Sequence, residues 1–417
     1  MKPIPLLSLT IGAALATAAP AAAATVSPEG VRFPQAAIDD GGATVVAWER
    51  RVKGSFAIEA RSGASATTLG RTHRLAGRGF RPQVAIGADG TRAIMWMQYG
   101  SNREQSIRVA IARPGRRFGE GRIVERRRST LAPVDVAVQP GGRVVAVWHR
   151  AARLRYALAS RGHGFAKAQT LGAGGVGSTL AVDGRDGTIV VPIAPAAPAQ
   201  AAVRTLAPSA SAFSEPVAVQ TGALPGAAVS EVGPSAVSGP GGAAVAYVLN
   251  GDPRVLALVR RNADGSWAPG QRIAIAAYGE NVFATDLQAT LATDGSAVAA
   301  WSVQTEAAGG LGGILSRTTV ASIAPSAAPF GAPQALSPGP PRRFTAPSVA
   351  AAGAEAFVAS AEPNGAVLLS TRPAGATTFS TRSLAADGDG DALLAAAGRH
   401  VIAIYQQDDR LRLKIVR

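Results

Sequence analysis

The chain contains no cysteine and few of the other residues that usually carry chemistry: three methionines, four histidines and 5% aromatic residues among 417. Without cysteine there is no disulfide, no lipid-modified cysteine anchor and no thiolate metal site, so the stability must come from a large buried core. No two histidines have the spacing of zinc ligands, and we expect no transition-metal site. The four are His73, His149, His163 and His400.

Long hydrophobic runs are absent after residue 24, and no later segment is apolar and unbroken enough to cross a membrane. Residues 1–24 combine an early lysine, an apolar middle and the small tripeptide Ala22-Ala23-Ala24, which is the layout of a cleavable secretory signal. We therefore exclude residues 1–24 from the fold and expect a protein that is secreted or associated with a bacterial-type cell envelope. A retained membrane anchor is the alternative, although the apolar stretch is short for a span.

Negative charge is scarce in the first half of the chain. Residues 1–208 hold 28 of the 42 Lys and Arg residues but 12 of the 27 Asp and Glu residues, so the net charge of +15 lies in this half. Most of these cations are arginines, which suit paired contacts with carboxylate, sulfate or phosphate groups. A GC-rich genome that places arginine at ordinary surface positions is the alternative explanation. Nucleic acid is not an expected partner, because the chain is exported and shows no aromatic-interleaved binding module.

What the chain has in quantity is a repeated pattern of an apolar run, a tight glycine turn and a second apolar run that often ends in tryptophan. One copy is "FRPQVAIGADGTRAIMW" at Phe80–Trp96, and similar copies stand at Phe33–Trp48 and Ala132–Trp148. Seven steps between eight copies average about fifty residues, which is the repeat length of a β-propeller blade. The turn glycines are Gly42, Gly90, Gly142, Gly187, Gly242, Gly295, Gly353 and Gly398.

Each copy also has a second half that completes a four-stranded unit. An alternating run such as "SIRVAIARP" (Ser106–Pro114) follows the tryptophan strand, and a short last strand follows a turn that contains an aromatic residue. Glycine-rich turns between four short strands predict an antiparallel blade. The first strand is rich in alanine, as expected near a crowded axis, and the second is apolar on both faces, as expected between neighbouring blades. We therefore expect Trp96 to pack between blades.

The two chain ends predict how the ring closes. The final copy stops after its third strand, and residues 25–32 form a segment without a partner ahead of the first copy. Pairing the two ends would complete the last blade and remove open sheet edges. We predict one all-β domain, residues 25–417, folded as an eight-bladed β-propeller of four-stranded antiparallel blades, with seven blades as the alternative. The expected blades span residues 33–78, 79–130, 131–176, 177–230, 231–281, 282–343, 344–388 and 389–417.

On this blade pattern the chain resembles secreted sialidase-like and other blade-repeat β-propeller proteins. The resemblance covers nearly all of residues 25–417 but includes no diagnostic motif. The nearest approach to an Asp box, "VDGRDGT" at Val182–Thr188, lacks the serine and the tryptophan, and no tryptophan is followed by the aspartate of WD repeats. "FRP" at Phe80–Pro82 is similar to the Phe-Arg-Ile-Pro element of sialidases, whose arginine binds a substrate carboxylate. Because "RFP" at Arg32–Pro34 holds the same place one blade earlier, we interpret Phe-x-Pro as the start of a blade.

Polar residues recur just inside the first strand of the blades, where their neighbours are apolar. In a propeller such side chains would gather at one mouth of the central channel, where they could bind a small ligand or a partner's loop, or hydrate the channel. The six candidate ligand-binding residues of this kind are Gln35, Gln83, Asp135, Ser235, Gln288 and Ser348.

A basic tract, "RRFGEGRIVERRR", runs from Arg116 to Arg128. It places Arg126, Arg127 and Arg128 on an outer strand or a connection between blades. A positive patch there could hold an acidic polysaccharide, a teichoic-type polymer or anionic headgroups. These three arginines are therefore further candidate ligand-binding residues.

An acidic segment, "DGDGD", places Asp387, Asp389 and Asp391 at the alternate spacing of calcium loops. The glutamate that would complete an EF-hand loop is replaced by Gly398. A solvated turn between the seventh and eighth blades is the alternative, so Ca²⁺ is the one cofactor that the sequence leaves open.

Taken together, these patterns predict an exported, monomeric binding or scaffold module without a catalytic centre, which recognises an acidic envelope polymer or an envelope protein. The alternative is a sialidase-like glycoside hydrolase or a polysaccharide lyase that acts at the channel mouth. Glycoside cleavage needs two paired carboxylates, and sequence alone does not pair the scattered acids. These are Glu49, Glu59, Asp135 and Glu306.

Overall fold

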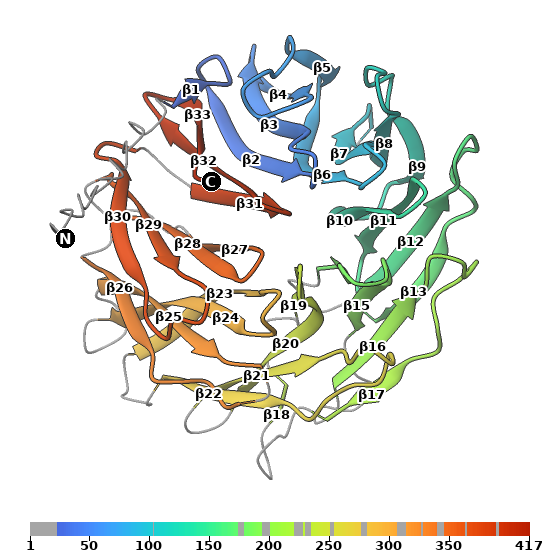
Figure 1. Ribbon diagram of the computed structural model, residues 1–417. Coiled ribbons are helices and arrows are strands. Elements are labelled where there is room, and N and C mark those ends of the chain that lie inside the picture. Colours follow the sequence, from blue (N-terminus) through green and yellow to red (C-terminus); the bar gives the residue numbers. More distant parts are fainter. Residues whose placement is uncertain are drawn as a thin grey trace, which may run out of the picture.

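The computed structural model describes residues 23–102, 104–173, 179–193, 201–220, 228–229, 235–250, 254–276, 282–306, 314–326, 328–339, 346–362, 365–388 and 392–417. Within these ranges every regular element is a β-strand. The strands form eight antiparallel sheets that stand side by side in a ring around a central axis (Figure 1). The chain is thus an eight-bladed β-propeller, which confirms the prediction from the repeat.

The first four blades follow the chain around the ring, each from the axis outward. Blade one contains β2 (Val31–Ile38), β3 (Thr44–Val52), β4 (Ser55–Gly63) and β5 (His73–Ala76). Blade two contains β6 (Gly79–Ile86), β7 (Arg92–Tyr99), β8 (Gln105–Ala112) and β9 (Arg122–Arg127). Blade three contains β10 (Leu131–Gln139), β11 (Arg143–Arg150), β12 (Arg153–Ala159) and β13 (Gln169–Ala173). Blade four contains β14 (Ala181–Val182), β15 (Ile189–Ile193), β16 (Ala201–Leu206) and β17 (Val217–Val219).

The next three blades repeat this order. Blade five contains β18 (Ala228–Val229), β19 (Ser235–Gly239), β20 (Gly242–Asn250), β21 (Arg254–Arg260) and β22 (Gln271–Ala276). Its first strand is in two pieces, since β18 and β19 both pair with β20, so residues 228–229 join the sheet of blade five although the repeat placed them in the range of blade four. Blade six contains β23 (Val282–Leu291), β24 (Ala297–Glu306), β25 (Ile314–Ala324) and β26 (Gln334–Gly339). Blade seven contains β27 (Ser348–Ala352), β28 (Glu355–Ala361), β29 (Val367–Arg372) and β30 (Ser380–Ala385).

The eighth blade joins the two ends of the chain, as predicted. It contains β31 (Ala392–Ala397), β32 (His400–Gln407) and β33 (Arg410–Ile415), and β1 (Ala24–Thr25) pairs with β33 as its outermost strand. Val26 N donates to Leu411 O at 2.8 Å, and Leu411 N donates to Ser27 Oγ at 2.8 Å. The described pairing begins at Ala24, the last residue of the predicted signal segment. These bonds close the ring by giving the eighth blade a fourth, outermost strand.

Buried tryptophans in the middle of four second strands hold neighbouring blades together. Trp48, Trp96, Trp148 and Trp301 are at most 1% exposed. Each packs in a core cluster with residues of the preceding blade: Trp96, for example, lies against Val45 and Ile58 of blade one. This confirms the expectation that Trp96 packs between blades. The core is therefore a series of apolar layers between blades rather than one central mass.

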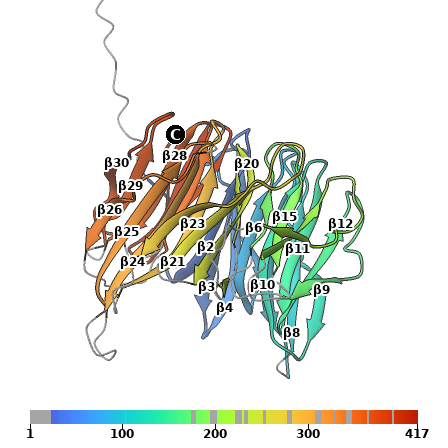
Figure 2. The same ribbon diagram turned by 90° about the horizontal axis from the view of Figure 1, so that it is seen from below.

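Two opposite faces of the ring carry the loops, because the antiparallel strands run across its thickness (Figure 2). We call one of them the connection face: it holds the links between blades, such as residues 77–78, 128–130 and 386–388, and the turns between second and third strands, such as 53–54 and 151–152. The opposite face, here the turn face, holds the turns between first and second strands, such as 39–43, 87–91 and 183–188. Turn glycines such as Gly90 adopt positive φ angles, which other residues rarely tolerate.

Candidate functional site

The six polar candidates of the first strands lie at nearly equivalent positions around the axis. Four follow a β-bulge and lie opposite the residue that precedes a buried tryptophan: Gln35, Gln83, Asp135 and Gln288. Ser235 lies opposite Ala246, which precedes the buried Tyr247. Ser348 lies opposite Ala359, which stands six residues after its turn glycine, whereas the partners of the four residues that follow a bulge stand five residues after theirs. The repeat pattern thus located this ring of positions to within one residue.

Two of the six use their side chains to hold the first strand of the next blade. The Asp135 carboxyl accepts a hydrogen bond from the backbone N–H of Leu180 in blade four. Ser348 Oγ accepts one from Leu394 N in blade eight at 2.9 Å. Inner strands of different blades are too far apart to form a common sheet, so such side chains supply the missing partners of backbone groups. In these two blades the candidate residue has a structural role.

Thr179 holds the same place in blade four and was missed by the sequence reasoning. Its Oγ1 accepts a hydrogen bond from Ala236 N of blade five at 2.7 Å. The register of β14 with β15 places Thr179 opposite Pro192, five residues after the turn glycine Gly187. Counting back seven residues from that glycine, as in blades one to three, leads to Leu180 instead, so the repeat spacing did not find Thr179.

The other four candidates are Gln35, Gln83, Ser235 and Gln288. Their side chains form no hydrogen bond with another residue in the described part of the chain, and all four are at least partly exposed. Gln35 and Gln83 directly precede Ala36 and Val84, which line the central channel. Gln35 and Gln83 do not line the channel themselves, so their polar atoms are available to water outside its lining.

The central channel is a cavity of about 620 Å³ along the ring axis, lined by the first strands of all eight blades. Its lining is mostly small and aliphatic, as in Ala37, Ala85 and Ala137. Asp135 is the one of the six candidates that contributes to this lining. Burial raises the pKa of Asp135 to about 7, although the backbone N–H groups of Val136 and Leu180 act in the opposite direction. The channel thus contains a carboxyl that titrates near neutral pH.

The three arginines of the basic tract lie at the outer rim of blade two, away from the channel. Arg126 Nε lies 3.5 Å from Glu104 and Arg127 Nε lies 3.4 Å from Glu125. Arg128 is exposed and forms no ion pair with a described residue. Because β9 runs toward the connection face, all three side chains stand at the connection-face end of the outermost strand.

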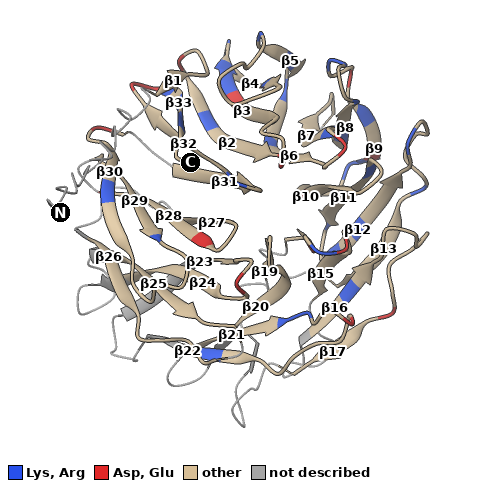
Figure 3. Ribbon diagram, in the orientation of Figure 1, with Lys and Arg blue, Asp and Glu red and all other residues tan. Residues whose placement is uncertain are grey.

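Further cations lie on the same face of blades one to three. Arg51 and Lys53 flank a turn of blade one, Arg78 and Arg81 lie where the chain enters blade two, and Arg153 follows a turn of blade three. All five are exposed and have no ion-pair partner within the described ranges. Figure 3 shows Lys and Arg along the arc of the ring from β2 to β16, with fewer between β23 and β31. The charge asymmetry of the sequence is therefore an asymmetry of the ring.

Carboxylates of blade one are already held by arginines. Glu49 is buried and accepts hydrogen bonds from Arg32 Nε and from Arg81 N, both at 2.7 Å. Glu59 accepts one from Arg50 Nη1 at 3.1 Å. Since Glu59 lies opposite Trp48, the neighbour of Glu49, the two carboxylates project from opposite faces of the sheet. They do not form the pair that glycoside cleavage requires.

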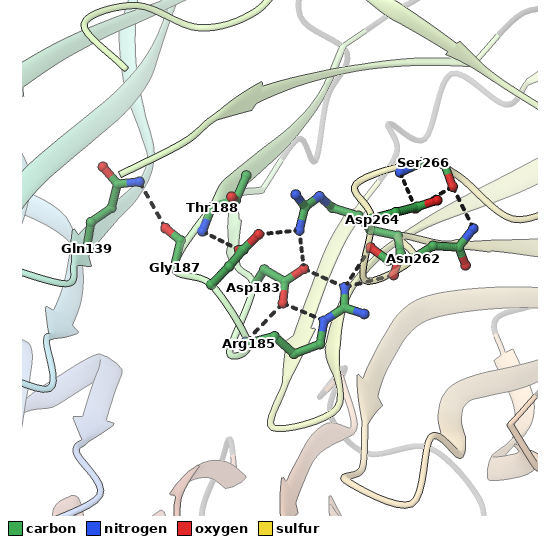
Figure 4. Close-up of polar contacts among 10 residues, drawn as sticks. Gln139, Asp183, Arg185, Gly187, Thr188, Asn262, Asp264 and Ser266 are labelled. Carbon is green, nitrogen blue, oxygen red and sulfur yellow. Dashed lines mark hydrogen bonds and ion pairs between the residues drawn. The ribbon is translucent and has the colours of Figure 1, made fainter. Parts of the chain in front are cut away.

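The segment nearest to an Asp box, around Asp183, forms a clasp between blades four and five (Figure 4). Asp183 is fully buried and accepts hydrogen bonds from Arg185 Nε at 2.9 Å and from Arg261 Nη1 of blade five at 2.8 Å. Arg261 also reaches Asp186 at 2.8 Å. Burial alone would raise the pKa of Asp183, but the hydrogen bonds from Arg185 and Arg261 outweigh it and hold the pKa below its usual value.

A similar clasp joins blades six and seven. Arg372 is 3% exposed and donates to Asp294 Oδ2 at 3.1 Å and to Ser296 Oγ at 2.7 Å. In both clasps an arginine at the end of a third strand holds the first turn of the preceding blade. These ion pairs on the turn face are therefore assigned to the stability of the ring.

Of the calcium candidates, only Asp387 lies within the described residues; Asp389 and Asp391 lie outside them. Asp387 is exposed and accepts a hydrogen bond from Gln407 Nε2 at 2.7 Å. The described residues contain no group of three or more His, Asp or Glu side chains that could hold a metal ion. They also contain no helix long and apolar enough to cross a membrane.

Comparison with known proteins identifies the fold alone. No family model and no curated protein matches the chain. Among solved structures it is similar to the polysaccharide lyase Uly1, with 10% identity over 80% of this chain and 90% of that one, at a TM-score of 0.51. A PL25 ulvan lyase bound to -[GlcA(1-4)Rha3S]- has 11% identity over 94% and 95%, at a TM-score of 0.49. Kuenenia stuttgartiensis hydrazine synthase has 10% identity over 94% and 97%, also at 0.49. At 10% identity the similarity to Uly1 indicates the fold alone and carries no information on activity.

Proposed function

We propose that this propeller is an exported binding module that holds an acidic cell-envelope polymer against the connection face of blades one to three. The observation that carries the proposal is the set of exposed arginines and one lysine there that have no ion-pair partner in the described chain. Unpaired surface cations attract a polyanion over a distance, and no internal ion pair has to break when the polyanion binds.

The arrangement of these cations over the surface favours a polymeric ligand over a small ligand in the channel. The cations extend from the start of β6 to the outer end of β9 and on to the turn before β12, which is a surface rather than a pocket. Glu49 and Glu59 of blade one are buried and already paired, and Glu104 of blade two is paired with Arg126. A long anionic chain can contact several of these arginines at once, and their separate contributions then add.

The test is binding of alginate, a carboxylate polymer, to the purified chain by isothermal titration at low and high salt. Replacing Arg78, Arg128 and Arg153 with serine removes three of the unpaired cations, each of which would form a pair of about 0.5–1 kcal/mol with the polymer, so affinity should fall about 10- to 100-fold. The matched control replaces Arg71, Arg117 and Arg161 with serine, which removes the same charge from exposed loops on the turn face. Equal losses in the two variants, or binding unchanged at high salt, would contradict the proposal.

A further inference from the structure

A continuous row of rings and a guanidinium crosses the connection face of blades one and two. We call it the aromatic row: Arg32 and Phe33 of β2, Phe56 of β4, Phe80 of β6 and Tyr99 of β7. The Arg32 guanidinium carbon lies 3.4 Å from the centre of the Phe56 ring and 5.2 Å from that of Phe33. Phe56 and Phe80 are 5.7 Å apart, and Phe80 and Tyr99 are 5.0 Å apart with their rings nearly perpendicular.

The row uses the same two positions of the blade repeat twice, with the residue types exchanged. Arg32 and Phe80 each form the last pair before the bulge of the first strand, opposite Glu49 and Met97. The next residues, Phe33 and Arg81, both adopt positive φ angles, +49° and +51°. Such angles are unfavourable for residues with a side chain and recur at functional sites. Blades one and two therefore each present one aromatic ring and one arginine at the bulge.

The ends of the row are exposed to solvent. Phe33 is 49% and Tyr99 39% exposed, and they are the two aromatic residues among the large apolar side chains exposed in the described chain. Arg32 covers one face of Phe56, and Phe80 is enclosed between Phe56 and Tyr99. Phe33 and Tyr99 consequently keep ring surface that another molecule can cover.

A buried carboxylate beneath the aromatic row holds it in place, so that few side chains have to become ordered when a ligand binds. The buried Glu49 carboxylate fixes Arg32 through its Nε and fixes the backbone of Arg81 through its N–H. This contact ties the bulges of the two blades together but leaves the Arg81 guanidinium exposed and without an ion pair in the described chain. A positioned arginine beside an exposed ring is a site for a flat or ring-shaped anion.

We infer that the aromatic row, with Arg81, binds the sugar rings of an anionic polysaccharide. The polarised C–H groups on one side of a pyranose pack against the electron-rich faces of Phe33 and Tyr99. The carboxylate or sulfate of the same polymer pairs with the planar guanidinium of Arg81. The inference rests on the proposed function and narrows its ligand from any acidic polymer to one built of sugars.

The position of the row also explains why the basic tract lies where it does. Tyr99 pairs with Gln105 across β7 and β8, and Gln105 pairs with Arg127 across β8 and β9. Two strand spacings of about 4.8 Å put Arg127 roughly 10 Å from Tyr99, about two sugar residues along a chain. A polymer on the row can therefore extend outward over the basic tract of blade two.

The experiment compares four probes on the full chain by isothermal titration: alginate, which offers carboxylates; dextran sulfate, which offers sulfates; neutral dextran; and polyglutamate, an anionic chain without sugars. We expect the Phe33→Ala/Tyr99→Ala variant to weaken alginate and dextran sulfate binding about tenfold, since two ring contacts are lost, and to change polyglutamate binding less than about twofold. Neutral dextran should show no measurable binding. The relative affinities of alginate and dextran sulfate identify which anion the site prefers.

Two controls separate the aromatic role from general changes. Ile123→Ala/Val217→Ala removes two exposed apolar side chains that lie off the row, at 38% and 44% exposure, and should leave every affinity unchanged. Tyr99→Phe keeps the ring and should retain binding. Arg81→Ala should weaken all three anionic probes, and Arg81→Lys should restore polyglutamate binding better than alginate binding, because lysine lacks the planar fork. Thermal midpoints within a few degrees of the parent confirm that each variant folds.

The outcomes for the two proposals differ. If Phe33→Ala/Tyr99→Ala leaves alginate binding unchanged, or if polyglutamate binds as tightly as alginate, the sugar site is wrong while the basic-face proposal stands. If no anionic probe binds, or if the Arg78, Arg128 and Arg153 variant binds like its turn-face control, the basic-face proposal fails. A higher affinity for oligo(dT) than for alginate would also overturn the inference, since single-stranded nucleic acid uses the same stacking and charge.

Discussion

The clasp between blades four and five makes a measurable contribution to stability, which replacing Arg261 with alanine tests. Arg261 is 11% exposed on its side chain and bonds two carboxylates, of which Asp183 is fully buried and Asp186 is 42% exposed. A hydrogen bond between charged groups contributes about 1.5–3 kcal/mol, and the exposed partner contributes less because water screens it. We therefore expect Arg261→Ala to lower the free energy of unfolding by about 2–4 kcal/mol, which for a chain of this length lowers Tm by about 3–5 °C.

The assay is differential scanning calorimetry on Arg261→Ala, Asp183→Asn and the double variant. Asp183→Asn should destabilise by about 3–5 kcal/mol, because it leaves Arg185 and Arg261 without their buried anion. The double variant should lose at least about 1 kcal/mol less than the sum of the single variants, since they share one contact. Arg272→Ala, an exposed arginine of the same blade without an ion pair in the described chain, is the control and should change stability by less than about 0.5 kcal/mol.

The contribution of the clasp to the free energy of unfolding should depend on pH in a definite direction. The folded-state pKa of Asp183 lies below its usual value, so the ionised clasp contributes fully above the unfolded-state pKa of about 4 and is lost as the pH falls through the folded-state pKa. The difference between the parent and Arg261→Ala should hold from pH 8 to pH 5 and shrink below about pH 4. Additive single variants, or a loss in Arg261→Ala no larger than in Arg272→Ala, would refute the assignment of the clasp to ring stability.

Two further predictions concern the axis and the closure of the ring. The folded-state pKa of Asp135 is raised to about 7, so its contribution to the free energy of unfolding is present below pH 4 and is lost as the pH rises toward 7. The Tm of Asp135→Asn should therefore rise relative to the Tm of the parent between pH 4.5 and pH 8. Parallel Tm curves would show that Asp135 does not titrate in this range. Ser27→Ala leaves the buried Leu411 N–H without its acceptor and should lower stability by about 1–3 kcal/mol in chemical denaturation, whereas Ser27→Thr should retain it; equal effects of the two substitutions would mean that this bond does not secure the closing strand.

The fold was predictable because each blade repeats a pattern that has a direct physical cause. Turn glycines such as Gly42 and Gly90 need positive φ angles, and a tryptophan six residues later fills the space against the preceding blade. The turn glycine returns in all eight blades and the buried tryptophan in four of them, so the spacing of the glycines counts the blades. The two incomplete ends of the sequence predict closure for a similar reason, since an eighth blade with three strands lacks one partner.

Blade five shows where the repeat does not suffice. Its first strand is divided into β18 and β19, and the expected boundary at residue 230 falls between the two pieces. Both pieces pair with β20, so the assignment of residues 228–229 depends on a contact with Leu249 and Asn250, which lie twenty residues further along the chain. The spacing of the repeat does not show that a first strand is divided into two pieces.

The candidate site was only partly predictable, because the bulge changes the direction of the residues that matter most. In a regular strand, alternation would place Phe33 and Gln35 on the same side. In the structure Phe33 and Pro34 together oppose Trp48, and the positive φ angle of Phe33 turns its ring outward, while Gln35 returns to the ladder opposite Ala47. A sequence pattern read with a period of two therefore found the residue after the bulge and passed over the residue within it.

The exchange of residue types between the first two blades is the signal that would have found the row. Arg32-Phe33 and Phe80-Arg81 each precede a proline and lie forty-eight residues apart, so the sequence contains the pairs in equivalent places. The start of a blade accounts for the proline, but it does not explain why an arginine and a phenylalanine occupy the two preceding positions in opposite orders in blades one and two. Packing would fix which position is aromatic, as it does for the tryptophans, whereas a surface that must offer one ring and one cation per blade can accept either order. The exchange is thus an argument for binding that is independent of the net charge.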